Sequence, residues 1–390
     1  MSEKLTVKNV VNINKSTLSS KDNWSTLKYL DTGNITENQI DTLQIFQKGE
    51  KLPSRAKRKV EKGTIIYSTV RPNQKHFGYF DTYSNDLVVS TGFATLDVID
   101  SRVNSKYLYY LLIQNSVISQ LQSIGENSTS SYPSIRPEDI GNLSFMFPDI
   151  DIQNKIADIL TSIDKKIQIN NQINQELEAM AKTLYDYWFV QFDFPDHNGK
   201  TFKSSGGKMV YNPELKREIP EGWGVEKLSH FLTIKNGKDH KHLQDGKFAV
   251  YGSGGIMRTV TDYLYSGESI LFPRKGTLNN VMYVNEKFWT VDTMFYSEVN
   301  KNNSALYVFY SVKDIDFNKL NTGTGVPSMT SSVLYDLNII VPEENILEKF
   351  NTIVKRNYET IKLNNNQNQK LIQLRDWLLP MLMNGQVKVE

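Results

Sequence analysis

The chain has 390 residues, 39% of them hydrophobic and 11% aromatic, with a formal net charge of +2, which describes a folded protein with room for two or three domains. So small a charge by itself says little about nucleic-acid binding, whereas the absence of cysteine excludes a disulfide framework, a zinc–thiolate site and a cysteine nucleophile. Because the sequence also has no signal-type apolar run at its start and no apolar segment of membrane-spanning length, we expect a soluble cytoplasmic protein with no membrane contact.

The pattern of residues 23–148 is that of a mixed α+β domain. Residues 64–70 and 87–91 are rich in β-branched side chains and are bounded by Gly and Asn, which predicts strands. Residues 106–122 have the apolar period of a helix. We therefore expect a first globule that ends near Pro148.

From residue 152 the apolar period becomes helical and continues to residue 188, over about 37 residues. Two heptad positions three residues apart describe it as a coiled-coil seam. The first position holds Ile156, Ile163, Asn170, Leu177 and Leu184, and the second holds Ile159, Ile173, Met180 and Tyr187. An ordinary amphipathic core helix is the alternative interpretation of either helix taken alone.

The second half of the chain repeats this order of elements. Residues 269–272 and 290–296 are predicted as strands and residues 305–312 as a helix, within a second globule at about residues 223–342. A second long helix is predicted at residues 346–382, with Ile353, Leu374 and Met381 at its second heptad position.

An internal repeat relates the two halves. Pro133 and Pro327 stand 194 positions apart, and the same offset superposes many apolar and amide residues of the two long helices without a gap. This indicates one structural unit used twice. If the helices pack antiparallel, their midpoints Asn170 and Asn364 meet, and a buried amide pair would fix the register; exposure of both residues is the alternative.

Motifs for catalysis are missing from the sequence. It contains neither a phosphate-binding G-x-x-x-x-G-K-[ST] loop nor H-E-x-x-H, and Gly252–Gly255 lacks the lysine that such a loop requires. His240 and His242 could bind a metal with Asp239, but a polar loop is the favoured interpretation because no third histidine or cysteine is near. We therefore expect a non-catalytic chain without a metal or a cofactor.

Polar and basic loops are the candidate nucleic-acid contacts. Seven Lys and Arg residues fall between Lys48 and Lys62, opposed by two Glu residues, and Arg, Lys, Asn and hydroxyl side chains are those that contact DNA phosphates and base edges. A solvated lysine-rich face and ordinary surface turns are the alternatives. The candidate contacts are Lys57, Arg58, Lys59, Arg71, Asn73, Lys75, His76, Ser128 and Ser130 in the first globule, and Lys238, Lys241, His242, Arg258, Arg274, Lys275, Asn279 and Thr324 in the second.

The junction between the halves resembles a known family. Residues 188–195 (WFVQFDFP), 204–210 (SSGGKMV) and 219–223 (IPEGW) resemble the junction in specificity subunits of type I restriction-modification enzymes. Residues 251–256 (YGSGGI), 273–277 (PRKGT) and 378–385 (LLPMLMNG) are similar to the same family. The resemblance covers nearly the whole chain.

This resemblance implies an α+β fold with two similar target-recognition domains, separated by two long helices that form an antiparallel coiled coil. The first domain would be residues 1–150 and the second residues 196–342, with the first spacer helix and junction at 151–195 and the second spacer helix and tail at 343–390. Such a subunit is not catalytic. It reads a bipartite double-stranded DNA target and docks modification (methyltransferase) subunits, two of them in our expectation, with restriction subunits as a further partner.

A non-catalytic coiled-coil scaffold whose basic loops bind a protein is the alternative function. Sequence-specific, salt-sensitive DNA binding separates the two. The resemblance leaves open the target sequence and its gap, the methylated base, the individual base contacts and whether a restriction subunit joins.

Overall fold

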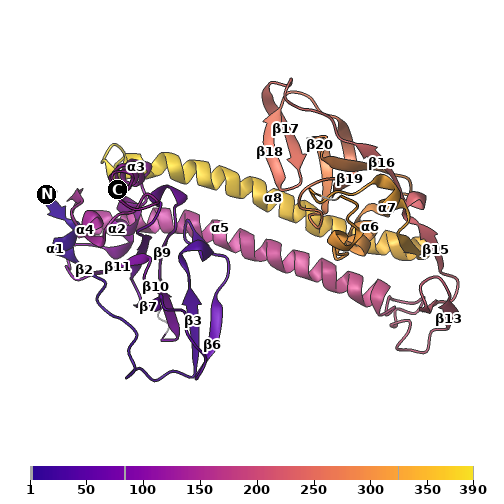
Figure 1. The fold of residues 1–390 in the computed structure, drawn as a ribbon, viewed down its shortest axis with the longest axis horizontal. Helices are drawn as coiled ribbons and strands as arrows, with labels where there is room; N and C mark the ends of the chain where they lie inside the picture. The colour runs from indigo at the N-terminus through magenta and orange to yellow at the C-terminus, as the bar shows by residue number, and fades with distance from the viewer. Residues whose placement is uncertain (1–2, 83–84, 324, 390) are drawn as a thin grey trace. The chain divides into compact units, whose positions relative to one another are not determined.

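The computed structural model describes residues 3–82, 85–323 and 325–389 and divides into two compact units (Figure 1). The first unit comprises the chain up to residue 169 together with the chain from residue 367, and the second comprises residues 170–366. Helices α5 (Ile150–Tyr185) and α8 (Glu344–Met383) each contribute one segment to each unit. Each unit is therefore a globule packed on two helical segments.

Helices α5 and α8 run antiparallel, as the second unit shows. Asn364 of α8 donates from Nδ2 to Oδ1 of Asn174 at 2.9 Å, and Asn357 Nδ2 donates to the Leu177 carbonyl at 3.4 Å. Further along, Phe350 of α8 packs on Phe189, just past the end of α5. Residue numbers rise along one helix as they fall along the other, which confirms the predicted antiparallel pairing.

The register differs from the prediction by one helical turn. Asn364 pairs with Asn174 rather than with Asn170, and Asn174 in turn donates to Asn365 Oδ1 at 2.9 Å. Asn170 is fully buried. The midpoint argument assumed that the helices align by their midpoints, whereas the amide pair Asn174–Asn364 and the packing of Phe350 on Phe189 set the register.

The first heptad position was predicted correctly and the second was wrong. The buried partner position on α5 lies four residues after the first, at Leu160, Ile167, Asn174, Ala181 and Trp188. The predicted residues Ile173, Met180 and Tyr187 are 40%, 60% and 50% exposed. On α8, Val354 and Asn368 are buried whereas Ile353 and Leu374 are exposed. The prediction chose the more hydrophobic residues, but these lie on the exposed flank of the helices. The buried seam has amide side chains at some of the positions beside them.

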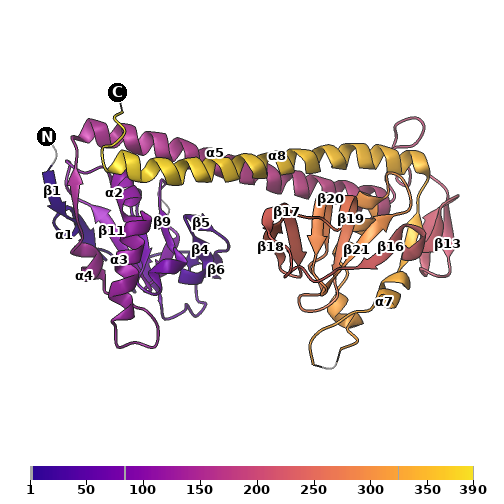
Figure 2. The same cartoon turned by 90° about the horizontal axis from the view of Figure 1, so that it is seen from above.

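The first globule contains two four-stranded sheets. Their orders are β2-β11-β8-β9 and β6-β3-β10-β7, and β10 runs parallel to β3. Short helices cover the first of these sheets, and Figure 2 shows α2 and α3 alongside its strands β11 and β9. The strands are β2 (Val11–Ile13), β3 (Thr26–Leu30), β6 (Gln44–Gln47), β7 (Ala56–Lys59), β8 (Ile65–Ser68), β9 (Phe77–Tyr79), β10 (Leu87–Ser90) and β11 (Phe93–Val98).

Smaller elements complete the first globule. Strand β1 (Glu3–Thr6) pairs antiparallel with β12 (Ser144–Phe147), and β4 (Ile35–Thr36) forms a short hairpin with β5 (Gln39–Ile40). The helices are α1 (Val7–Val10), η1 (Thr32–Asn34), η2 (Pro72–Gln74), α2 (Ser105–Leu112), α3 (Asn115–Glu126) and α4 (Pro137–Gly141).

The second globule repeats this topology in a six-stranded sheet of order β16-β21-β19-β20-β17-β18. Its long strands β19 and β20 each take the place of two shorter strands of the first globule. Strand β20 runs parallel to β17, as β10 runs parallel to β3. The strands are β16 (Leu232–Asn236), β17 (Asp245–Gly252), β18 (Gly255–Val260), β19 (Tyr265–Pro273), β20 (Met282–Thr290) and β21 (Met294–Val299).

The remaining elements of the second unit also have counterparts. Strand β15 (Gly224–Lys227) pairs with β22 (Asn338–Val341) as β1 pairs with β12. The helices are η4 (Leu228–His230), α6 (Ala305–Lys313), η5 (Phe317–Leu320) and α7 (Ser331–Tyr335), and a hairpin of β13 (Met209–Asn212) and β14 (Arg217–Pro220) follows the π-helical turn η3 (Asp186–Val190). The repeat predicted from sequence is therefore a repeat of fold.

Two predicted elements are interrupted. The helix predicted at residues 106–122 is two helices, α2 and α3, because the chain bends at Ile113 and Gln114. The strand predicted at 290–296 ends at Thr290 and resumes at Met294, where a turn reverses the chain between β20 and β21. Neither break contains a glycine or a proline, so the sequence carries no strong signal for it.

The junction packs into the core of the second unit through aromatic side chains. Phe194 stacks between Phe202, with a centroid distance of 4.7 Å, and Trp223, with a centroid distance of 4.8 Å. Phe192 adopts a φ of 65° and packs edge-on against Trp223. The junction motif is thus a packed element of the second unit.

Candidate nucleic-acid interface

In both globules, the loop after a central strand packs against the loop before a short helix. In the first globule, Arg71 N donates to the Pro133 carbonyl at 2.8 Å, and Val70 forms an isolated bridge with Ser134. In the second, Gly276 N donates to the Pro327 carbonyl at 3.1 Å, and Lys275 forms a bridge with Ser328. We call residues 69–76 with 127–135 the first loop pair, and residues 274–281 with 321–323 and 325–329 the second loop pair.

The first loop pair contains six predicted contacts, which are Arg71, Asn73, Lys75, His76, Ser128 and Ser130. The Arg71 guanidinium lies 4.3 Å from the centroid of the Tyr132 ring. Ser128 and Ser130 form a hydroxyl–hydroxyl hydrogen bond of 2.9 Å, and Ser130 also donates to the Tyr132 carbonyl. The exposed Asn73 is fixed through its backbone N–H, which donates to Gln122 Oε1 at 3.2 Å. The loops are therefore tied to each other and to α3.

Lys75 and His76 anchor the first loop pair to the hairpin β4–β5. Lys75 Nζ lies 2.6 Å from Glu37 Oε1. His76 Nδ1 lies 2.5 Å from the Ile35 carbonyl, and its Nε2 lies 3.3 Å from Gln74 Oε1. A role for both residues in DNA binding stays a prediction, but their side chains already have partners within the globule.

Of the predicted triplet Lys57, Arg58 and Lys59 on β7, one side chain is exposed. Lys57 is exposed, whereas Lys59 is paired with Asp22, a hydrogen bond that holds the pKa of this carboxyl below its usual value. Arg58 is half-buried, and this burial lowers the pKa of its guanidinium. Lys57 is the member of the predicted triplet best placed to meet a phosphate.

The second loop pair presents Arg274 and Lys275, which are both exposed. The Arg274 guanidinium lies 5.9 Å from the Phe295 ring centroid. Asn279 donates from Nδ2 to Asp316 Oδ1 at 3.1 Å, which lowers the pKa of Asp316 and ties the loop to η5. Thr324 lies outside the described residues.

The remaining candidates lie on the segment after β16 and on β18. Lys238, Lys241 and His242 are exposed, and the Lys238 carbonyl accepts from Trp289 Nε1 at 2.9 Å. Arg258 forms an ion pair of 2.6 Å with Asp245. His242 Nδ1 lies 3.9 Å from Asp239, and the described part of the chain contains no cluster of His, Asp and Glu side chains arranged to hold a metal.

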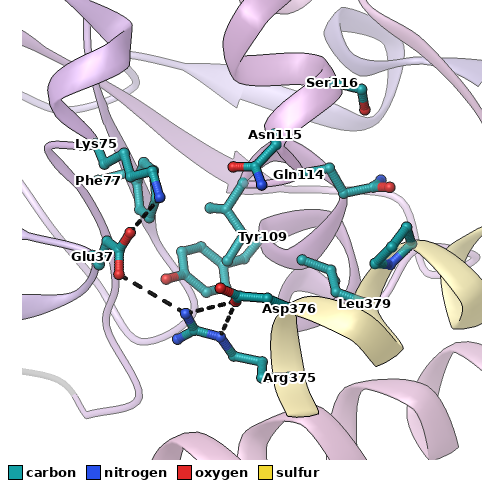
Figure 3. Close-up of a pocket in the computed structure, with 12 residues that line it drawn as sticks. Glu37, Lys75, Phe77, Tyr109, Gln114, Asn115, Ser116, Arg375, Asp376 and Leu379 are labelled. Carbon is teal, nitrogen blue, oxygen red and sulfur yellow. Dashed lines mark hydrogen bonds and ion pairs between the residues drawn. The ribbon is translucent and has the colours of Figure 1, made fainter. Parts of the chain in front are cut away.

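A pocket in the first unit is lined by Lys75 of the first loop pair, by Glu37 and by Arg375 of α8 (Figure 3). Glu37, already paired with Lys75, lies 3.8 Å from Nη2 of Arg375 on α8. Arg375 also pairs with Asp164 of α5 at 3.1 Å, and Asp164 accepts the Tyr110 hydroxyl at 2.6 Å. This chain of contacts connects the first loop pair with both helices of its unit.

Tyr132 was missed as a contact residue, although its loop was predicted. It is 55% exposed, and its counterpart at the 194-residue offset, Val326, is 62% exposed. Both precede the aligned prolines, whose carbonyls accept hydrogen bonds from the equivalent residues Arg71 and Gly276. The repeat itself was the signal that could have identified them.

The comparisons with known proteins identify the class. The family model described as "Type I restriction modification DNA specificity domain" matches residues 2–179 and 220–373. The chain is 30% identical to the MjaIX specificity subunit of Methanocaldococcus jannaschii, over 93% of this chain and 84% of the relative. It is 25% identical to the HindI specificity subunit of Haemophilus influenzae, over 92% and 94% respectively.

A solved structure agrees on the fold. The S subunit of a type I restriction-modification system from M. genitalium superposes with a TM-score of 0.63 at 17% identity, covering 98% of this chain and 96% of that one. The chain belongs to the family of type I restriction-modification DNA specificity subunits. It is a non-catalytic DNA-recognition subunit. Over the described residues, none of the helices is both long enough and apolar enough to cross a membrane.

Proposed function

We propose that this chain reads a two-part DNA target, one half with the first loop pair and the other half with the second loop pair. The observation that supports this most is the repeated contact between loops, Arg71 to Pro133 and Gly276 to Pro327, at equivalent places in two globules of the same topology. Two equivalent surfaces on one chain suit two short sequences read separately.

The domain assignment follows from the same repeat. Residues 1–150 and 196–342 are the two target-recognition domains, residues 151–195 are the first spacer helix with the junction, and residues 343–390 are the second spacer helix with its tail. Exposed Lys57, Lys241 and Lys275 serve phosphates, while other side chains of the loop pairs serve base edges. Paired residues such as Lys75 and Arg258 hold the loops in place.

The partners are the modification subunits, which we place on the exposed apolar flank of the helices. Ile173, Met180 and Tyr187 form this flank on α5, and Ile353 and Leu374 lie at the matching heptad position on α8. Apolar residues left outside a helix seam are typical of a surface that a further chain covers. Because both helices carry such a flank, two modification subunits dock, and restriction subunits join through the same complex, in the cytoplasm.

A selection experiment tests the proposed function. The full-length chain with its modification subunits is presented with random duplex DNA, and the bound sequences are read. Two short preferred sequences at a fixed separation are expected, with affinity that falls steeply with salt. A scaffold protein would enrich no sequence, and that result would contradict the proposal.

The contribution of Lys57 is measured separately. Lys57→Ala should reduce the slope of log affinity against log salt by about 0.9, the effect of one lost phosphate contact. Lys208→Ala is the matched control, because Lys208 is exposed but lies on the junction hairpin, where it pairs with Glu221. An unchanged slope for Lys57→Ala would mean that Lys57 is an ordinary solvated surface residue and contacts no phosphate.

A further inference from the structure

We propose that Arg71 reads a guanine in the major groove of the half-site bound by the first globule. The inference rests on the proposed function and adds the base and the residue that recognises it. Three observations carry it: the backbone conformation of Arg71, the ring that holds its side chain, and the contrast with the other basic candidates.

The backbone at Arg71 is in a conformation that favours glycine. Its φ is 48°, and the following Pro72 begins the turn η2. The equivalent position of the second globule is Gly276, with φ of 89°. A non-glycine residue in the left-handed region is strained and persists where the surroundings over-determine it, commonly at a ligand-binding site. The first globule therefore keeps an arginine side chain where glycine is the easier residue.

The Tyr132 ring orients the Arg71 side chain without neutralising it. The guanidinium lies 4.3 Å from the ring centroid, and Tyr132 is itself 55% exposed. A cation–π contact engages the face of the guanidinium and leaves its N–H groups at the edge able to donate. Among the described residues, no carboxylate lies within ion-pair distance of Arg71.

Three of the other basic candidates differ in this respect. Lys59 is paired with Asp22, Lys75 with Glu37 and Arg258 with Asp245, so DNA would have to compete with a carboxylate for each. The exposed Lys57 offers charge but no fixed plane. A phosphate requires only a positive charge within reach, whereas a base edge requires donors in a fixed direction.

Guanine is the base that matches such a side chain. It presents two acceptors, O6 and N7, to the major groove, and the guanidinium offers two parallel donors. Adenine presents one acceptor and one donor there, which suits an amide such as that of Asn73 instead. The pairing of Arg71 with guanine is therefore specific to one base pair.

The test compares Arg71→Lys and Arg71→Gly with the wild-type chain, each full-length and with its modification subunits, in selection from random DNA. We expect the wild type to prefer guanine at one position of one half-site by about 10-fold or more. Arg71→Lys should reduce this preference several-fold and Arg71→Gly should abolish it, with the other half-site unchanged. Arg71→Gly should unfold within a few degrees of the wild type, because glycine adopts this backbone without strain.

Arg102→Lys is the matched control, since Arg102 is engaged by Asp100 and Glu3 on the same globule, and its preference should equal that of the wild type. An even loss of affinity over all sequences, with a lower salt slope, would make Arg71 a phosphate contact and overturn the inference. An unchanged preference, or a lost preference for another base, would overturn it as well. If the wild type itself selects no sequence, it is the proposed function that fails.

Discussion

Arg375 of α8 places Nη1 3.1 Å from Oδ1 of Asp164 on α5, and its side chain is 14% exposed. Although burial opposes a charge at this position, Asp164 and Asp376 raise the pKa of Arg375, so the guanidinium stays charged. Burial together with the charge of Asp164 raises the pKa of Tyr110, which keeps its hydroxyl protonated as a donor to Asp164. The Arg375–Asp164 pair is therefore a clamp that holds α5, α8 and α2 of the first unit together.

Loss of this clamp should be costly. Arg375→Met leaves the Asp164 carboxylate, 28% exposed, without its main cation, and should lower the free energy of unfolding by about 3 kcal/mol, the low end for a buried pair. Lys182→Met is the control, because the Lys182–Asp314 pair is 48% and 65% exposed and should contribute less than about 1 kcal/mol. Equal losses in denaturant unfolding for the two variants would contradict the clamp.

The amide pair Asn174–Asn364 should show energetic coupling. Asn174→Leu or Asn364→Leu alone removes the 2.9 Å hydrogen bond and leaves a partly buried amide, at a loss of about 1 to 3 kcal/mol in the free energy of unfolding. The double variant should recover much of this loss, because two leucines suit the seam. A double-mutant cycle measures the coupling, and strictly additive losses would rule out the contact.

Substitutions at seam residues of α5 should lower stability, whereas substitutions at flank residues should weaken docking of the modification subunits. Leu160→Ala, at a fully buried seam position, should lower the free energy of unfolding by about 2 to 5 kcal/mol. Met180→Glu, at a 60% exposed position, should leave the unfolding temperature nearly unchanged but weaken binding of the modification subunits in a pull-down. Gln175→Glu introduces the same charge at another exposed position of α5 and should bind normally; equal weakening would place docking elsewhere.

Asp97 should make stability fall as pH rises. Burial, with a smaller contribution from Glu61, raises the pKa of Asp97 although it accepts a hydrogen bond from Thr64 Oγ1. The folded state then binds the proton more tightly than the unfolded state, so the stability from protonated Asp97 is complete below the unfolded pKa of about 4 and is lost above the folded pKa. Asp97→Asn should therefore raise the unfolding temperature at pH 7, by an amount that shrinks toward pH 4.

Asp100 is the control of opposite sign for this pH dependence. Its pKa is lowered by hydrogen bonds from Arg102, so its contribution is present above the unfolded pKa and is lost as pH falls through the folded pKa. Asp100→Asn should lower the unfolding temperature at pH 7. Shifts of the same sign in both variants would show that burial does not dominate at Asp97.

The repeat and the helices could be predicted from sequence because both are periodic. The 194-residue offset and the first heptad position needed no knowledge of tertiary contacts, and Ile156 and Ile163 are buried as expected. The second heptad position could not be predicted, since Asn174 and Ala181 look less apolar than Met180 and Tyr187. Only pairing between the helices makes an amide the better seam residue.

The sequence could predict which loops hold the candidate contacts, but not the role of each residue within them. Arg71, Lys75 and His76 stand close together in the sequence, yet only Arg71 is turned to an exposed ring while the others anchor the loop to Glu37 and the Ile35 carbonyl. These partners lie about 35 to 60 residues away, so composition could not separate readers from anchors. The strained φ of Arg71 likewise leaves no mark in composition.

An exchange of globules tests the central claim, that two independent readers recognise two parts of one target. Residues 23–148 are replaced by the corresponding segment of a related specificity subunit, and the preferred DNA is determined by selection in the presence of the modification subunits. The account predicts that one half-site changes while the other half-site and the gap stay as they were. A simultaneous change of both half-sites would contradict it.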